Sequence, residues 1–483
     1  MEDLLPKQSF FARHEFEGNL SKRDEVADKL HVVVQYSLIK EGEIVGKVLG
    51  TRKTFKKLGR LLNLPGPYLK LTSEKVEHIT TDIFSDKVLL RKTTHRVWPP
   101  GYGEEMTSII SDLIFENITI TEHYGTSDNL ERHLTFFLAG PRRLWQVHED
   151  RKLSFTGEIK SKVQNSKIEL NADLPFEIEI VPSYFYDKTP APDNHELTTK
   201  VLVLHLKTKE SVEQFSNEDF VNSGKSLADD LTLLVSFLSR HWVTWYRYEL
   251  QTSDILETYI RRTKECSTNE LGWDDTLVEW REAREFLKVG FRNLRKLRAE
   301  GLDLSMPIVY CVSGNEAKYL EEQFTTFFLS LEKIKDMFAL KPKKHLRENL
   351  PDKAFKKLRS LISDVIEKNV ESSEVVEKIQ TKIPELNRPS LRFVLESLFH
   401  RYNVDWTDIY PQASGLTLIK TRDKLFHSSR ALNIDLLVKE LHRLQAIIER
   451  LLLRMMGWDD LSRSPTDFMK KWLTAVDNDS NDT

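Results

Sequence analysis

Hydrophobic and polar positions alternate with a period of two from about residue 30 to residue 208. The clearest segments are His31–Ile39, Leu113–Thr121, Phe176–Ile180 and Val201–Leu206. This alternation, rich in β-branched residues and broken by Gly and Pro, is typical of strands in an antiparallel sheet or sandwich. We therefore expect a strand-rich N-terminal domain over residues 1–222.

The apolar spacing changes to three and four after about residue 223. One predicted helix carries Leu227, Leu231, Leu234, Phe237 and Leu238 and runs toward Trp242 and Trp245. A second helix, predicted over 274–297, carries on another face the basic stripe Arg281, Arg284, Lys288, Arg292 and Arg295. That stripe fits a solvated face stabilised by i,i+4 ion pairs, or a surface that tracks phosphates or docks a partner. We expect a helical middle segment over residues 223–312.

The last third of the chain is patterned as helices throughout. Ser313–Glu316 resembles a capping box, and an apolar stripe follows it from Leu320 to Phe338. Further amphipathic helices are predicted after Pro351, after Pro389 and from Asn433 to Gly457. Four to five helices with short connections predict a bundle over 313–460, followed by a tail over 461–483. The predicted fold class is α+β: a strand-rich N-terminal domain, then helices, then a C-terminal four- to five-helix bundle.

Composition limits the classes of function. The 483 residues carry a formal net charge of −3, so any nucleic-acid surface has to be a local patch. The two cysteines, Cys266 and Cys311, cannot form a disulfide framework or a four-cysteine zinc site, which indicates a reducing compartment. No run approaches the roughly 20 apolar residues that cross a bilayer, and the N-terminus lacks an apolar signal core. We expect a cytoplasmic protein that does not bind a membrane.

One short segment carries candidate chemistry: Arg422, Asp423, Lys424, Leu425, Phe426 and His427. A histidine exchanges protons near neutral pH, and a guanidinium holds a phosphate through two parallel hydrogen bonds. Residues five apart on an ideal helix are separated by about 140° around its axis. We therefore expect the helix to end or loosen between Arg422 and His427, and Ser428 and Ser429 fit such an ending.

Spacing alone is a weak signal, because Arg143 and His148 have the same spacing. Their context differs. The earlier pair follows a predicted strand and a Gly-Pro turn, and Leu144 comes directly after its arginine. The later pair lies between predicted helices, and Asp423 comes directly after its arginine. Context therefore favours Arg422 and His427.

With this motif, the C-terminal third resembles the HEPN superfamily, whose mark is Arg, then Asn, Asp or His, then a few residues and a His, before the last long helix of a four- to five-helix bundle. The order of strand-rich part, helical middle and HEPN end also resembles ApeA-type bacterial proteins, implicated in phage defence by abortive infection. The resemblance implies a metal-independent endoribonuclease that leaves 2′,3′-cyclic phosphate and 5′-hydroxyl ends. His427 is then the general base or acid, Arg422 holds the phosphate, and Asp423 orients one of them.

The resemblance implies no cofactor and no metal. It implies RNA as substrate and a homodimer through the C-terminal bundle, in which two motifs face each other across a two-fold axis. In such a toxin-like enzyme, the N-terminal part would restrain cleavage until a phage-derived trigger arrives. Further RNA-binding candidates are Lys424 and the basic residues Lys341, Lys343, Lys344 and Arg347, which equally suit a flexible charged loop.

Other interpretations remain open. Arg422 and His427 are also compatible with a solvated pair at a helix end, with Asp423 as an ordinary ion-pair partner. The protein would then be a non-catalytic dimerisation, nucleotide-binding or RNA-binding module. A metal-dependent nuclease is disfavoured, since the chain has no His-Glu-x-x-His run. We interpret Glu332 as an exposed helix residue and His400 as a packed or capping histidine.

Overall fold

The computed structural model describes two compact units. They comprise Met1–Thr232 with Trp242–Asp274, and Leu233–His241 with Asp275–Thr483. The residues described within them are 11–22, 25–37, 44–51, 69–74, 80–85, 88–95, 108–115, 117–123, 132–139, 149–153, 159–163, 168–170, 176–187, 197–208, 216–261, 276–279, 282–339, 350–387, 389–410, 416–427, 433–461, 463–464 and 467–474.

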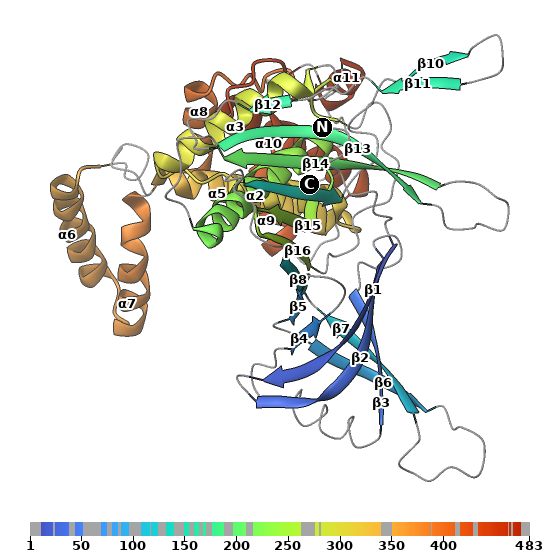
Figure 1. The fold of residues 1–483 in the computed structure, drawn as a ribbon. Coiled ribbons are helices and arrows are strands. Elements are labelled where there is room, and N and C mark those ends of the chain that lie inside the picture. The colour runs from blue at the N-terminus through green and yellow to red at the C-terminus, as the bar shows by residue number, and fades with distance from the viewer. Residues whose placement is uncertain are drawn as a thin grey trace. The chain divides into compact units, whose positions relative to one another are not determined.

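The first unit contains an antiparallel sheet (Figure 1). Six neighbouring strands of this sheet follow one another in the spatial order β13 (Phe176–Asp187), β14 (Leu197–Thr208), β9 (His133–Ala139), β15 (Thr244–Gln251), β16 (Ile255–Arg261) and β8 (Asn117–His123). On one side, β13 also pairs with β12 (Ile168–Leu170). On the other side, the order continues from β8 to β5 (Thr80–Ser85), β4 (Leu69–Glu74), β1 (Phe11–Lys22), β2 (Glu25–Ser37), β3 (Ile44–Thr51), β7 (Ser108–Phe115) and β6 (Val88–His95). A separate ribbon pairs β10 (Glu149–Leu153) with β11 (Ile159–Val163).

Helix α2 (Asn217–Ser239) covers one face of this sheet. A Cβ atom on Gly224 would lie 2.3 Å from Leu134 Cδ2 and 3.0 Å from Leu206 Cδ1, so the helix backbone rests directly on these strand side chains. The absence of a side chain at Gly224 makes this close approach possible. The indole Nε1 of Trp245 donates to Asp229 Oδ1 on α2 over 2.7 Å, which attaches the helix to β15.

The predicted strand pattern is confirmed in part. His31–Ile39 overlaps β2, Phe176–Ile180 lies within β13, and Val201–Leu206 lies within β14. The segment Leu113–Thr121 was one predicted strand, but the structure divides it between β7 and β8. Those two strands pair with different neighbours, β7 with β3 and β6, and β8 with β5 and β16. Alternation identified the strands but not where one ends and the next begins.

The segment 223–312, predicted as a helical middle segment, contains two strands. Trp245 belongs to β15, and β15 and β16 pair with each other, with β9 and with β8. Long-range pairing therefore overrides the local helical interpretation. In addition, the helix predicted over 274–297 begins later, as α3 (Ala283–Ala299), while residues 276–278 form bends.

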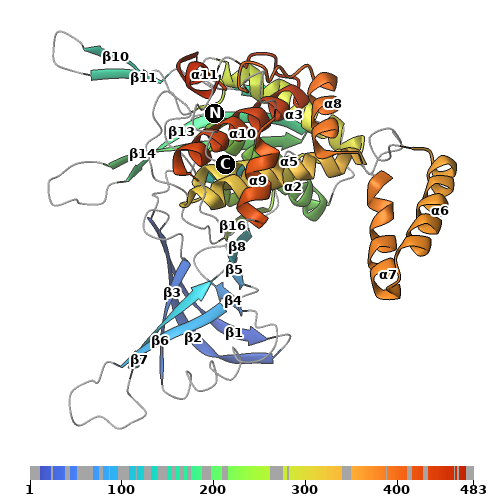
Figure 2. The same cartoon turned by 180° about the vertical axis from the view of Figure 1, so that it is seen from behind.

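Helices form the second unit (Figure 2). Those not yet named are α4 (Ser305–Glu316), α5 (Leu320–Ala339), α6 (Asp352–Asn369), α7 (Ser373–Lys382), the 3-10 helix η3 (Ile383–Asn387), α8 (Leu391–Arg401), α9 (Leu418–His427), α10 (Ile434–Met455) and α11 (Asp467–Thr474). Helix α10 contacts α4, α5, α9 and α11. Leu444, Ile447 and Leu451 on α10 are fully buried, so this helix lies in the core of the unit.

Several helix boundaries differ from the sequence-based expectation. Ser313–Glu316 is the last turn of α4 rather than a capping box, so the boundary predicted between residues 312 and 313 falls inside a helix. The apolar stripe from Leu320 to Phe338 is confirmed as α5. Helix α10 ends as predicted, with Gly457 in the left-handed region at φ 79°. Part of the predicted tail is helical, because α11 lies within 461–483 and Leu473 is fully buried.

Among the described residues, no helix is both long enough and apolar enough to cross a bilayer.

Candidate functional site on helix α9

Helix α9 contains the whole candidate motif. The expectation that the helix ends or loosens between Arg422 and His427 is wrong, because α9 is continuous from Leu418 to His427. Ser428 and Ser429 lie outside the described residues. The next described helix is α10, the longest of the second unit after residue 275, so the motif precedes the long helix as expected.

The start of α9 is attached to buried polar groups on α10. The Thr417 hydroxyl donates to Glu440 Oε1 over 2.5 Å, and Arg443 Nη1 donates to the same oxygen over 2.5 Å. The side chains of Glu440 and Arg443 are 0% and 2% exposed. Leu418 is fully buried next to this attachment. The helix that carries the motif is therefore held by both apolar packing and a buried ion pair.

Arg443 extends this attachment to α11. Its Nε donates to the carbonyl oxygen of Leu473 over 2.9 Å, and its Cζ lies 5.5 Å from the ring centroid of Tyr410. Burial and the nearby carboxylate of Glu440 raise the pKa of Tyr410 well above its usual value, so this ring stays neutral. One buried guanidinium thus connects α9, through Glu440, with the end of α11.

Arg422 and Asp423 form the polar part of the site. Arg422 Nη1 donates to Asp423 Oδ1 over 2.9 Å, and the two side chains are 35% and 53% exposed. The Cζ of Arg422 lies 5.6 Å from the ring centroid of Phe328 on α5. The Arg422 guanidinium thus lies between the carboxylate of Asp423 and an aromatic ring of α5.

Helical geometry decides which of these residues share a face. Position 427 comes one turn after Asp423 and Lys424, both exposed, so its backbone position is on their face of α9. Arg422 is about 140° away from position 427 around the axis. The structure therefore brings Arg422 and Asp423 together but does not bring Arg422 and position 427 onto one face. The side chain of His427 lies outside the description.

The other predicted site residues are less informative. Lys424 is exposed on α9, whereas Lys341, Lys343, Lys344 and Arg347 lie outside the described residues. Glu332 is half-buried and its Oε1 lies 3.6 Å from Lys335 Nζ, one turn along α5. His400 is exposed in the last turn of α8, so of its two expected roles, packed or capping, the packed one is wrong.

The basic stripe on α3 is largely exposed where it is described, which both interpretations of it require. Arg284, Lys288 and Arg292 are exposed, and Arg295 is half-buried with its Cζ 5.7 Å from the Phe291 ring. Arg281 lies outside the described residues. Within the part of the chain that the structure describes, no three His, Cys, Asp or Glu side chains are grouped to hold a metal ion.

Thr417, Glu440, Arg443 and Phe328 were not among the residues expected at the site. A signal existed for two of them. Glu440 and Arg443 are charged residues three apart within the apolar repeat Leu437, Leu441 and Leu444. Charged residues are rarely buried without a partner, so an i,i+3 pair of opposite sign inside an apolar stripe indicates a buried ion pair.

No protein-family model, no curated protein and no solved structure matches this chain. The resemblance to the HEPN superfamily therefore rests on the six residues Arg422 to His427 and on their place before a long helix. What that resemblance implies about activity is a proposal.

Proposed function

We propose that α9 carries the active site of a metal-independent HEPN-type endoribonuclease, a latent toxin-like effector in phage defence. The observation that carries the proposal is the pairing of Arg422 with Asp423 on the exposed side of α9, one turn before position 427. In this proposal the HEPN-like bundle is built on α10 and the helices that contact it, α4, α5, α9 and α11. A firm attachment of α9 through Thr417 and Glu440 supports it, because a catalytic group has to be held in place.

The reaction proceeds without a metal. The 2′-hydroxyl oxygen attacks the adjacent phosphorus, the bond from phosphorus to the 5′ oxygen breaks, and a 2′,3′-cyclic phosphate forms. A base takes the proton of the 2′-hydroxyl and an acid gives a proton to the departing 5′ oxygen, so the number of protons is unchanged. His427 serves as base or acid, and Arg422 stabilises charge on the phosphate oxygens. Asp423 orients Arg422 through their hydrogen bond.

A homodimer would bring an Arg422 and a His427 to the same phosphate, although the two positions lie on different faces of α9. Because Arg422 and position 427 are about 140° apart on α9, one chain does not direct both toward one phosphate along a straight helix. Two α9 helices facing each other across a two-fold axis would place Arg422 of one subunit near the partner subunit's His427. The sheet of the first unit would act as the sensor that restrains cleavage until a phage-derived trigger arrives.

A second candidate function is a non-catalytic dimerisation, nucleotide-binding or RNA-binding module. The observation that favours it is the same ion pair. Asp423 partly neutralises the Arg422 guanidinium, and an anionic ligand would have to compete with that carboxylate. In this case the pair is a surface contact of α9 and His427 takes no part in chemistry.

The two functions are separated by incubating the full-length protein with total cellular RNA in EDTA. The variants are Arg422→Ala and His427→Ala, and the matched controls are Arg143→Ala and His148→Ala, which have the same spacing. We expect the wild type and both controls to produce fragments with cyclic-phosphate ends. The Arg422 and His427 variants should lose about 100-fold or more in rate.

The same reactions with extract from phage-infected cells test for latency. Cleavage that appears only with this extract, and only when Arg422 and His427 are intact, supports a triggered enzyme. Absence of cleavage with and without extract, or equal cleavage by all variants, contradicts the enzyme. Retained RNA binding by the variants would then favour the binding module.

A further inference from the structure

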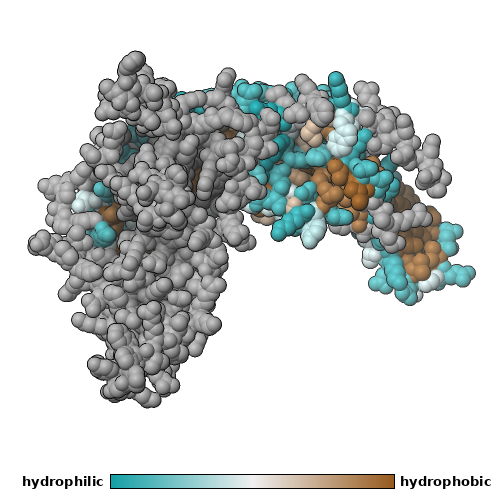
Figure 3. Space-filling model, turned by 90° about the vertical axis from the view of Figure 1, so that its right-hand side faces the viewer, coloured by the Kyte–Doolittle hydropathy of each residue, from teal (hydrophilic) through white to brown (hydrophobic). Residues whose placement is uncertain are grey.

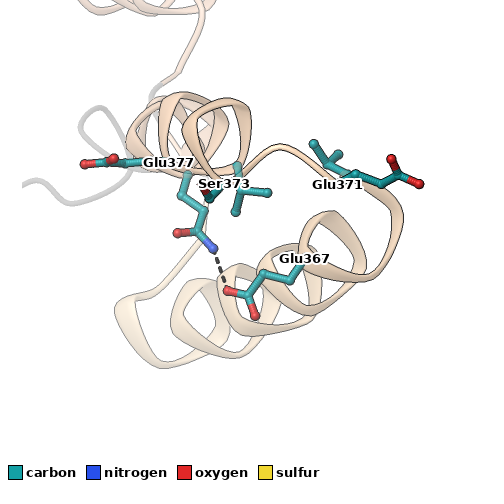
Figure 4. Close-up of a pocket in the computed structure, with 7 residues that line it drawn as sticks. Glu367, Glu371, Ser373 and Glu377 are labelled. Carbon is teal, nitrogen blue, oxygen red and sulfur yellow. Dashed lines mark hydrogen bonds between the residues drawn. The ribbon is translucent and has the colours of Figure 1, made fainter.

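Helices α6 and α7 with η3 form a hairpin whose two ends are fastened together. The backbone N–H of Leu350 donates to Asn387 Oδ1 over 2.7 Å, and Asn387 Nδ2 donates to the carbonyl oxygen of Leu350 over 3.1 Å. Near the turn, Gln380 Nε2 donates to Glu367 Oε1 over 2.7 Å across a shallow hollow between the helices (Figure 4). The hairpin is thus defined by its own contacts from residue 350 to residue 387.

An apolar stripe on α6 lies on the surface. Leu358, Leu361 and Val365 are 38%, 55% and 59% exposed, and Ala354, one turn earlier, is exposed as well. Apolar side chains are visible at the surface of the described helices in Figure 3. A separate stripe, Phe355, Ile362 and Ile366, is half-buried. The packing within the hairpin therefore uses one side of α6 and leaves the Ala354–Val365 stripe, here called the α6 seam, uncovered.

The α6 seam has the spacing of a coiled-coil interface. Its members are separated by four, three and four residues, which is the alternation of a and d positions in a heptad repeat. This spacing places successive side chains along one face of an under-wound helix, where a second helix with the same spacing can interlock with them. The half-buried stripe of α6 already serves the packing within the hairpin, so that packing does not account for the α6 seam.

The charges next to the α6 seam show which second helix fits. In this spacing Leu358 and Val365 occupy the a positions. Lys357 and Asp364 are both exposed, and each comes directly before one of these two residues. When two copies of α6 pair antiparallel with Leu358 against the partner's Leu361, Lys357 lies next to the partner's Asp364, and the reverse contact follows by symmetry. A parallel pair would instead place Lys357 next to the partner's Ile362, with no ion pair.

We propose that the α6 seam is a docking surface for α6 of a second copy of this chain, in antiparallel, two-fold symmetric pairing. The contact is isologous, so one seam serves both copies. The seam has four layers and its ion pairs are exposed, so the association depends on protein concentration. This contact is distinct from the dimer through α9 and does not rest on RNA cleavage.

Charge reversal tests the proposal on the full-length protein by sedimentation equilibrium at several concentrations. In the antiparallel pair, either Lys357→Glu or Asp364→Lys puts like charges next to each other at both symmetric contacts. Each variant should therefore raise the dissociation constant about tenfold or more. The double variant Lys357→Glu with Asp364→Lys restores opposite charges and should return close to the wild-type constant. Lys356→Glu is the matched control, an adjacent exposed lysine outside the α6 seam and its flanking positions, and should behave as the wild type.

Leu361→Asp removes the centre of the α6 seam. Because Leu361 is 55% exposed, the variant should keep the melting temperature measured at low concentration and still lose one step of assembly, from dimer to monomer or from tetramer to dimer. A wild type that stays monomeric at all concentrations overturns the proposal. So does an assembly constant that is the same in the wild type and in Leu361→Asp, or a double variant no tighter than the two single variants.

Discussion

Thr417 and Glu440 are joined by a hydrogen bond of 2.5 Å that connects the residue before α9 with the second turn of α10. Glu440 is fully buried, and its second hydrogen-bond donor is the guanidinium of Arg443. The helix that carries Arg422 and Asp423 therefore depends on a charge pair that solvent does not reach.

Replacing Glu440 by Gln tests this dependence. The variant leaves the guanidinium of Arg443 buried without its carboxylate, and loss of one partner from a buried pair costs roughly 3–5 kcal/mol. We expect the free energy of unfolding to fall by about that amount in urea denaturation. Glu374→Gln is the matched control, since the pair Glu374–Lys378 is 76% and 72% exposed and should change stability by less than about 0.5 kcal/mol. Equal effects of the two variants would contradict a buried role for Glu440.

Arg422→Lys tests whether the planar guanidinium is needed. Lysine keeps the charge but lacks the fork that binds a phosphate bidentately, so we expect the rate of RNA cleavage to fall by roughly 10²–10³-fold. Lys420→Ala is the control, because Lys420 is exposed on α9 and has no role in the proposed site. Both rates are measured from initial fragment formation under the conditions in which the wild type cleaves. Full activity of Arg422→Lys would show that charge alone suffices.

Replacement by alanine is expected to change the stability of the protein in opposite directions at Gly457 and at Gly290. Gly457 has φ 79°, and an added Cβ would lie 2.2 Å from Nδ2 of Asn293, the atom that donates to the Met456 carbonyl. We expect Gly457→Ala to destabilise the protein by about 1–2 kcal/mol or more. Gly290 lies within α3, where an added Cβ meets nothing closer than 3.7 Å, so Gly290→Ala should stabilise by about 0.5–1 kcal/mol. The free energy of unfolding of both variants is measured by urea denaturation. A change of the same sign in both would contradict the prediction.

The stability of the protein is expected to depend on pH through the side chain of His442. Burial lowers the pKa of His442 below its usual value of 6.5, although Glu449 opposes this shift, and the ring centroid lies 5.7 Å from that of Trp472. The unfolded chain therefore binds a proton at a higher pH than the folded chain. The contribution of His442 to stability is complete above about pH 6.5 and is lost as the pH falls through the folded-state pKa.

The measurement is the free energy of unfolding between pH 5 and 8, for the wild type and for His442→Gln. We expect the wild type to lose more stability on acidification than the variant. Parallel curves would mean that His442 does not have a lowered pKa in the folded protein.

The elements that sequence analysis identified correctly are those whose pattern is local. The stripe from Leu320 to Phe338 repeats every three to four residues, and it forms α5. The strands β13 and β14 follow the period of two at Phe176–Ile180 and Val201–Leu206. Periodicity reports which side of an element is apolar, and burial of that side is what stabilises it.

Other elements depended on partners distant in the chain. The segments β15 and β16 became strands because β9 and β8 offered edges for pairing, more than 100 residues earlier. Ser313–Glu316 has the residues of a capping box, but tertiary packing of Cys311 and Val312 extends α4 through it. Local propensity is a weak preference that such contacts override.

The candidate site shows the same division. The residue types of the motif, their spacing and their place before a long helix follow from the sequence alone, because they are properties of order along the chain. The pairing of Arg422 with Asp423 was among the interpretations of the sequence, because the two residues are neighbours in the chain. Only the tertiary structure decided that α9 stays helical through His427, that Arg422 lies beside Phe328, and that Thr417 binds Glu440. These features arise from side chains that folding brings together across α5, α9 and α10, and no local pattern encodes such distances.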